Sequence, residues 1–366
     1  MTFTEVDGLL LQAVNDGIVP GISVCVRADG QELHCASFGH AELDPNTRPA
    51  DVDTVWDLAS VTKALGATPV AMALVGKGHL DLHAPINERL PDVPSGITAA
   101  HCLAHVSGLP KWDPMWETLG LDEAGSKALR DDVLMRARTL APIADPGESY
   151  VYSDMGFLTL CALLEDVGGE RLDALYERYV RVPSGADLRW GWEGAAATED
   201  CPHRGHVVCG EVHDLNAWMM GGVSSHAGLF GSCRSMALAA EWQLRAWQGD
   251  MKTGLAPEVV RQFWAHKAVG SHHLGWDGVS PSGSSAGKKW PLDGVGHLGF
   301  TGCSVWIAPR QGVVVAIASN RVHPLIEGGA VPDAPIHPRY AAFRRLRPAV
   351  HTAIIDVLEC ETGWLT

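Results

Sequence analysis

The sequence has no long apolar run and no secretory leader. No stretch of the 366 residues approaches the roughly 20 apolar positions that a transmembrane helix needs. The first seven residues carry neither the positive nor the apolar region of a signal peptide. We therefore expect a cytoplasmic protein without membrane contact, or a periplasmic one if a leader has been removed.

Positive charge is scarce as well. The chain has 28 Lys and Arg against 43 Asp and Glu, a formal net charge of −15, and it shows no basic stripe and no internal repeat. This balance disfavours nucleic acids and anionic membranes as partners. Hydrophobic residues make up 46% and charged residues 19%, which argues against disorder and for one large core or two lobes. The oligomeric state is left open.

The nine cysteines show no metal-site spacing. They form an odd set without a Cys-Xaa-Xaa-Cys pair, and most lie in apolar segments, which predicts buried, reduced thiols. The adjacent His272 and His273 would point to opposite sides of a strand, and no acidic or cysteine partner has ligand spacing. We expect no metal and no cofactor.

What the sequence does contain is a serine one helical turn before a lysine, at Ser60-Val61-Thr62-Lys63. Residues three apart on a helix share a face, so the amine of Lys63 can reach the hydroxyl of Ser60. A partly desolvated lysine can be the base that activates a serine. The apolar run 64–75 that follows is helical in spacing, and Pro69 predicts a kink or an early first turn. The alternative is an N-cap serine beside a solvated lysine.

Two later segments strengthen the catalytic interpretation. Tyr152-Ser153-Asp154 resembles the second motif, usually Tyr-Xaa-Asn, of the penicillin-recognising serine hydrolases, and His297-Leu298-Gly299 resembles their third motif in its His-Xaa-Gly form. Three motifs in order are more specific than one. The chain resembles the class C β-lactamase-like family, which includes esterases, D-stereospecific peptidases and transesterases. The resemblance covers roughly residues 5–325, including segments 105–110, 221–230 and 320–324.

The fold class that the resemblance implies is α+β, an antiparallel sheet flanked by N- and C-terminal helices plus a mostly helical lobe. It implies a discontinuous sheet domain of residues 1–81 and 203–366, a helical lobe of residues 82–202, and an active site in the cleft between them. The residue pattern itself predicts helices near 6–14, 158–164, 237–247 and 350–358, strands near 22–26, 32–38, 303–308 and 313–318, and a hairpin turn at 28–30.

The same resemblance implies the site roles. Ser60 would attack a carbonyl, Lys63 and Tyr152 would share the acid and base work, and the backbone N–H groups of Ser60 and Phe300 would form the oxyanion hole. Which of Lys63 and Tyr152 takes the first proton is left open. Substrate contacts are expected at Asp154, His297 and Gly299.

Several other residues compete for a role. Ser285 repeats the serine–lysine spacing with Lys288 but lies in a turn-rich stretch, so we interpret it as a loop residue. Lys252-Thr253-Gly254 matches the family's lysine-based third motif but precedes a predicted helix start at Pro257, not a strand. Site contact and structural packing both stay open for His226, Trp112, Trp116 and Trp276, and His105 and Ser107 are expected to shape a turn beneath the site.

Two departures from the family pattern bear on function. Asp154 replaces asparagine and should raise the pKa of Lys63. His297 replaces lysine and, with an ordinary pKa near 6.5, would gain charge only toward about pH 6. Both changes lower the affinity of the cleft for anions. We expect an esterase or amidase that acts on small neutral or cationic substrates; the alternatives are a β-lactamase or D-Ala-D-Ala-type peptidase acting on a β-lactam or peptide, and a catalytically inactive binding protein on the same fold.

Overall fold

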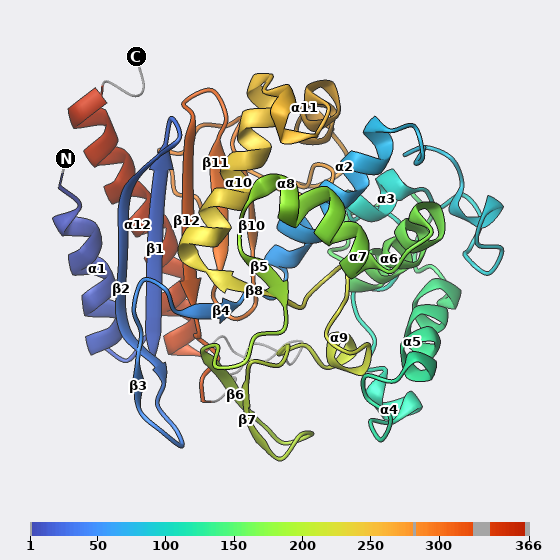
Figure 1. The fold of residues 1–366 in the computed structure, drawn as a ribbon, viewed down its shortest axis with the longest axis horizontal. Coiled ribbons are helices and arrows are strands. Elements are labelled where there is room, and N and C mark those ends of the chain that lie inside the picture. Colours follow the sequence, from blue (N-terminus) through green and yellow to red (C-terminus); the bar gives the residue numbers. More distant parts are fainter. Residues whose placement is uncertain (1, 281–282, 325–336, 363–366) are drawn as a thin grey trace.

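A computed structural model describes residues 2–280, 283–324 and 337–362. Its centre is a seven-stranded antiparallel sheet (Figure 1) with the order β3-β2-β1-β12-β11-β10-β9. The strands of this sheet are β1 (Gly21–Ala28), β2 (Gln31–Glu42), β3 (Arg48–Pro49), β9 (Asp277–Gly278), β10 (Val295–Leu298), β11 (Ser304–Ala308) and β12 (Val313–Ser319).

The middle of the sheet joins the two ends of the chain. β1 pairs with β12 over seven residues, from Ile22 opposite Ser319 to Ala28 opposite Val313. β12 is buried along its whole length and β1 along all but its last residue, as expected for strands covered on both faces. This pairing fixes β10, which carries the third motif, relative to the N-terminal strands.

Helices cover both faces of the sheet (Figure 1). On one face α1 (Thr4–Asn15) and α12 (Pro338–Thr362) pack on an apolar cluster that includes Trp306 and Phe343. On the other face lie α10 (Cys233–Gln248), α11 (Pro257–Ala265) and α2 (Thr68–Gly76). None of the helices within the described ranges combines the length and the apolar character that spanning a bilayer requires.

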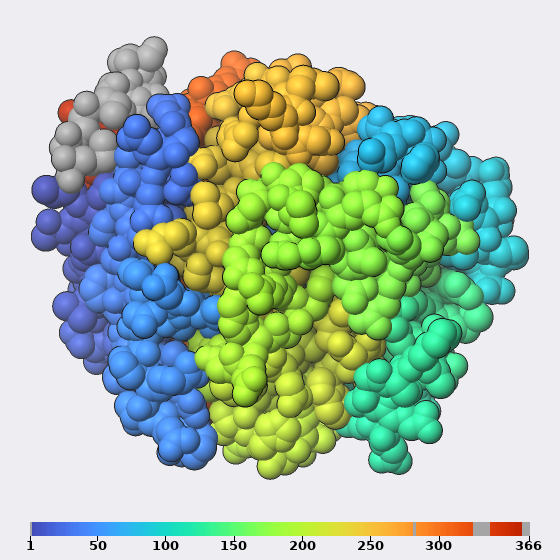
Figure 2. Space-filling model, viewed as in Figure 1, coloured from blue at the N-terminus to red at the C-terminus, as the bar shows by residue number. Residues whose placement is uncertain are grey.

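The remaining helices and two small sheets lie beside the large sheet. In the space-filling view, the segment around residues 160–230, coloured green, covers the centre of the face of the molecule that is turned toward the viewer (Figure 2). The helices beside the large sheet are α3 (Ala99–Leu103), α4 (Trp116–Leu119), α5 (Lys127–Thr139), α6 (Asp154–Gly168), α7 (Leu172–Tyr176), α8 (Val182–Ser184) and α9 (Leu215–Met219). The short helical turns are η1 (Lys63–Ala67), η2 (Ile86–Glu88), η3 (Glu177–Arg181) and η4 (Met251–Thr253). The small sheets contain β4 (Val55–Asp57), β8 (Leu229–Ser232) and β5 (Leu188–Trp190), and β6 (Ala197–Cys201) with β7 (His206–Cys209).

The predicted fold class is confirmed, and the predicted strands and helices are present. The hairpin turn has Asp29 and Gly30 at positive φ, 49° and 80°, as a two-residue turn requires. Helix α12 is much longer than predicted because it continues through Pro348. The short strands β5 and β6 were not predicted, since three to five residues without alternation give no periodic signal. The division into two lobes at residues 82 and 203 stays a prediction.

Candidate active site

The segment that carries Ser60 is held in an unusual backbone conformation. β4 ends at Asp57, and Ala59 follows with φ of 45°, a left-handed value that costs free energy in any residue with a Cβ. The buried Asp57 carboxylate accepts from the backbone N–H of Ala59 at 2.7 Å and of His213 at 2.6 Å. These bonds fix the turn that presents Ser60.

Lys63 begins the π-helical turn η1, and α2 follows without a break, with Pro69 in its first turn, directly after the π-helical segment. The fully buried ammonium donates to Ser60 Oγ at 3.0 Å, to Asp154 Oδ1 at 2.7 Å and to the His226 carbonyl at 3.3 Å. The expected spatial neighbourhood of Ser60 and Lys63 is therefore present.

The Asp154 carboxylate decides the charge of Lys63. Burial alone would lower the pKa of Lys63, but Asp154 and then Tyr152 raise it, and the net result is a raised pKa. The predicted effect of Asp154 on Lys63 is confirmed in direction. Lys63 is thus an ammonium ion in the resting site, and Asp154 is its counter-ion.

Tyr152 lies against both residues. The Lys63 ammonium lies 4.9 Å from the centre of the Tyr152 ring, and the side chains of Ser60 and Lys63 both influence the ionisation of the Tyr152 hydroxyl. Burial raises the pKa of Tyr152, while Lys63 lowers it to a smaller extent, so the phenol is neutral at rest. The start of α6 is fixed by Ser153, which caps Gly156 N–H at 3.0 Å and donates to the Pro110 carbonyl at 2.6 Å.

Gly299 lies where β10 leaves the sheet and approaches the Ser60 segment. A Cβ atom at this position would lie 2.5 Å from the Leu58 carbonyl oxygen, so only glycine fits. Thr301 donates to the Asp57 carbonyl at 2.7 Å and fastens the two segments together. Within the described residues, no backbone carbonyl accepts from the N–H of Ser60 or of Phe300. Both donors are left for the predicted oxyanion hole.

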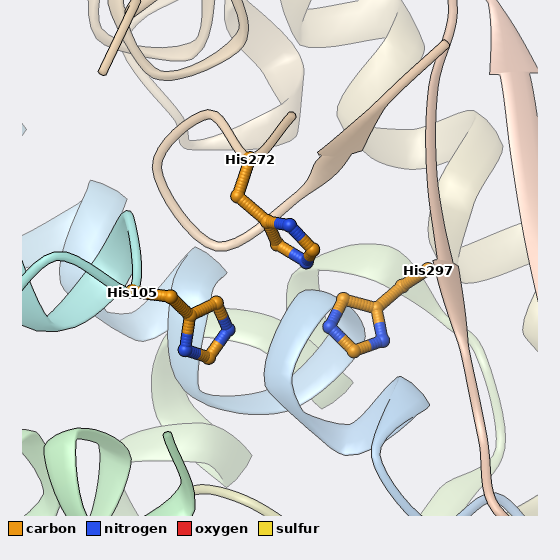
Figure 3. Close-up of side chains that lie close together, drawn as sticks. All are labelled: His105, His272 and His297. Carbon is orange, nitrogen blue, oxygen red and sulfur yellow. The ribbon is translucent and has the colours of Figure 1, made fainter. Parts of the chain in front are cut away.

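Three buried histidines lie beside Tyr152, and the sequence did not predict their contact. Figure 3 shows His105, His272 and His297 each turning a ring nitrogen into the space between them, and one nitrogen of each lies within 4.8 Å of the others. The ring centres of His105, His272 and His297 lie 4.3, 5.6 and 6.1 Å from that of Tyr152.

The chemistry of this cluster does not suit a metal ion. His105 Nδ1 accepts from Ser153 N–H at 3.0 Å, so its proton is on Nε2, the atom that faces the other rings. His297 Nδ1 instead donates to the Leu298 carbonyl at 2.9 Å, and His272 Nδ1 pairs with the Tyr150 hydroxyl at 2.8 Å. A metal requires a lone pair from every ligand, and His105 presents an N–H.

The same burial keeps the three rings neutral. It lowers the pKa of His297 and of His105 well below 6.5 and that of His272 to about 3, with further lowering by the nearby Lys63 charge. The expectation that His297 has an ordinary pKa and gains charge toward pH 6 is therefore wrong. The reason is burial, which the position of His297 in its motif did not indicate.

The other candidate residues have clear positions. Lys252 is exposed in η4, directly before Gly254 and the start of α11, and Ser285 lies in a loop where it accepts from Trp306 Nε1 at 3.2 Å. His226 reaches the site through its carbonyl, while its ring pairs with Asp214 at 2.9 Å.

The three tryptophans differ from one another. Trp276 is buried against Trp264 and has a packing role. Trp112 is 45% exposed and packs edge-on against Trp116, with 5.2 Å between ring centres. The carbonyl of Lys111, the residue before Trp112, accepts a hydrogen bond from the Asp154 N–H at 2.9 Å. This bond ties the segment that carries Trp112 to the site.

Known proteins resemble this chain over most of its length. The family model described as Beta-lactamase matches residues 6–333. The N-acetylmuramyl-L-alanine amidase of Bacillus subtilis (strain 168) is 27% identical over 365 aligned positions, which cover 88% of this chain and 82% of the amidase. A protein of Salmonella enteritidis, provisionally named a D-alanyl-D-alanine carboxypeptidase, is 26% identical over 392 positions, covering 96% and 89%.

Solved structures share the fold. The hydrolase EstCE1, described as having promiscuous acyltransferase activity, superposes with a TM-score of 0.72 at 21% identity and covers 95% of this chain and 98% of its own. The octameric penicillin-binding protein homologue from Pyrococcus abyssi gives a TM-score of 0.69 at 19% identity, with coverage of 87% and 74%. Since the family model spans nearly the whole chain, the chain belongs to the beta-lactamase family.

Proposed function

We propose that this protein is an acyl-transferring serine hydrolase that uses Ser60 as its nucleophile and prefers small esters or amides. The observation that carries the proposal is the single buried ammonium of Lys63, which donates at once to Ser60 and to Asp154 beside the Tyr152 hydroxyl. A serine held by a buried cation and a phenol has the partners that nucleophilic catalysis needs.

In the acylation step, Ser60 Oγ forms a bond to the substrate carbonyl carbon and loses its proton. Lys63 is already protonated, so we assign the proton to Tyr152, which accepts it in the small fraction of molecules that hold the phenolate beside the ammonium. The backbone N–H groups of Ser60 and Phe300 would stabilise the oxyanion. When the tetrahedral intermediate collapses, the leaving alcohol or amine takes the proton from Tyr152. Water then releases the acyl group by the reverse sequence.

The substrate preference follows from the charges around the nucleophile. The charge of Lys63 is matched by Asp154 at 2.7 Å, and His297 is neutral where the family pattern has a lysine. A carboxylate-bearing substrate therefore gains little binding energy from either residue, whereas the binding of a neutral ester or amide does not depend on a cation there. Exposed Trp112 is suited to pack against an apolar acyl or alcohol group.

A peptidase or β-lactamase is the second candidate, because two relatives bear the names of an N-acetylmuramyl-L-alanine amidase and a D-alanyl-D-alanine carboxypeptidase, both of which denote hydrolysis of an amide bond. A catalytically inactive binding protein is disfavoured by the intact contacts between Ser60, Lys63 and Tyr152. Nitrophenyl butyrate, a D-amino acid amide and a chromogenic cephalosporin should be compared with wild type and Ser60→Ala. We expect the butyrate to have the highest kcat/KM; a cephalosporin preference overturns the esterase assignment, and no Ser60-dependent turnover of any substrate overturns the enzyme.

A further inference from the structure

A second cluster of reactive side chains lies on the large sheet, apart from the residues assigned to catalysis. Cys25 on β1 and Cys35 on β2 are directly opposite each other, and their sulfur atoms lie within 4.8 Å. Cys25 is fully buried in the core below α10, while Cys35 is only half-buried. No disulfide is present among the nine cysteines, so both are free thiols here.

A bulge in the hairpin brings the two thiols together. A two-residue turn that pairs Ala28 with Gln31 would, without interruption, place Cys25 opposite His34. The register shifts between Val26 and Arg27, leaving Leu33 as the extra residue of β2, and from there Cys25 faces Cys35. The shift by one residue turns Cys35 to the same face of the sheet as Cys25.

The ladder also gives this pair its close spacing. The backbone N–H of His40 donates to the Pro20 carbonyl at 2.8 Å, so positions 20 and 40 form a hydrogen-bonded pair. Because bonded and non-bonded pairs alternate along an antiparallel ladder, Cys25 and Cys35 form a non-bonded pair, with Cα atoms about 4.5 Å apart. That spacing lies within the range of disulfides.

A neighbouring pair shows that side chains touch across this ladder. Ser23 and Ser37 form the adjacent non-bonded pair on the same face, and their hydroxyl oxygens lie 2.9 Å apart. Two sulfur atoms placed in the same way need only small rotations to bond. We propose that Cys25 and Cys35 form a reversible cross-strand disulfide when the protein meets a peroxide.

The two thiols have different roles in this reaction. The neighbouring Cys25 side chain lowers the pKa of Cys35, which is also the more accessible of the two, while the Cys25 thiol itself donates toward Glu32 Oε2 at 3.9 Å. The Cys35 thiolate attacks one peroxide oxygen and the O–O bond breaks. Cys35 becomes a sulfenic acid, and the other peroxide oxygen leaves as hydroxide. Cys25 then attacks the Cys35 sulfur, the S–O bond breaks, and the thiol proton leaves with the hydroxyl as water.

A metal site at the same place is disfavoured by Glu32, the third residue of the cluster. Both of its carboxylate oxygens are engaged by Arg234, at 2.8 and 3.1 Å. A metal would have to displace this bidentate pair to gain an oxygen ligand. The other thiol near Cys25, that of Cys233, is buried and donates to the Ala316 carbonyl at 3.2 Å, so it does not compete as a partner.

Mass spectrometry tests the proposal because trypsin cleaves after Arg27 and separates the two cysteines. The full chain is treated with hydrogen peroxide, blocked with N-ethylmaleimide and digested. We expect a Cys25–Cys35 linked peptide that dithiothreitol splits. Cys35→Ser should lose it, and Cys25→Ser should leave Cys35 as a sulfenic acid that dimedone traps. Cys209→Ser, which removes another half-buried strand cysteine, should retain the link.

Three outcomes would overturn the proposal. In the first, Cys25 and Cys35 remain fully labelled by N-ethylmaleimide after peroxide treatment. In the second, Cys25 is linked to Cys233. In the third, one equivalent of zinc protects both thiols from labelling and peroxide produces no linked peptide, which would identify a metal site. Dithiothreitol-sensitive linkage in a Ser23→Cys, Ser37→Cys double variant serves as the control for ladder geometry, since it tests the spacing with new thiols.

Discussion

The chain contains the spacing Ser-Xaa-Xaa-Lys twice, and the two copies have different structures. At Ser60 the lysine is fully buried, lies 3.0 Å from the hydroxyl and has a carboxylate partner. At Ser285 the residues lie in a loop, Lys288 is exposed, and the hydroxyl accepts from a tryptophan. The spacing only permits the contact. A helical turn, burial and a counter-ion are what make a lysine act on a serine.

The largest effect should come from the nucleophile. Ser60→Ala should lower kcat by about 10⁴-fold or more, because no other hydroxyl in the site has the same partners. Ser285→Ala should leave kcat within about twofold. Ester hydrolysis by both purified variants, with circular dichroism to check folding, tests this contrast. An acyl adduct mapped to a peptide without Ser60 would contradict it.

The next largest effect should distinguish the lysines. Lys63→Ala or Tyr152→Phe should lower kcat by at least about 10²-fold, since each removes a positioned acid or base. Lys288→Ala and Lys252→Ala should change it little because both side chains are exposed. If Lys252→Ala were as damaging as Lys63→Ala, the third motif would have been assigned to the wrong segment.

Replacing Asp154 should shift the pH dependence of catalysis in a defined direction. This carboxylate raises the pKa of Lys63 and also that of Tyr152. If the pair must lose one proton before reaction, kcat/KM for a neutral ester should rise with pH above 7. In Asp154→Asn both pKa values fall, so the rise should begin at lower pH, by about one unit. Asp53→Asn, an exposed aspartate, is the matched control. An unchanged profile in Asp154→Asn would refute the role of Asp154.

The smallest expected effect concerns His297. Its low pKa keeps His297 neutral from pH 8 to pH 6. Titration of His297 should therefore not change the ratio of kcat/KM for a neutral ester to kcat/KM for an anionic cephalosporin over this pH range. His297→Lys should improve the cephalosporin about tenfold relative to the ester, the typical gain from a charge-assisted hydrogen bond. A melting temperature near that of wild type shows that the lysine has been accommodated. A ratio that falls steeply toward pH 6 in wild type would show a charged His297.

The sequence predicted the features that depend on near neighbours. Ser60 and Lys63 are three residues apart, and the turn at Asp29 and Gly30 is local, so spacing and residue type were enough. It did not predict the contact of His105 with His272, which are 167 positions apart and lie on separate segments, one after α3 and the other before β9.

The bulge at Leu33 shows the same limit within a hairpin. The turn type predicts a register in which Cys25 and Cys35 do not face each other, and a single extra residue reverses that outcome. Nothing in the local sequence marks Leu33 as unpaired. The burial of His297 was missed for a related reason, since its solvent exposure depends on rings supplied by distant segments.

The backbone of Ala59 has a consequence for engineering. A left-handed φ costs an alanine roughly 1–2 kcal/mol, whereas glycine adopts it freely and loses about 0.5–1 kcal/mol through the entropy of the unfolded chain. Ala59→Gly would therefore be among the substitutions that a screen for heat resistance retains. The same change would loosen the turn that presents Ser60. Selection for thermal stability would therefore favour glycine at position 59, whereas selection for turnover would favour alanine.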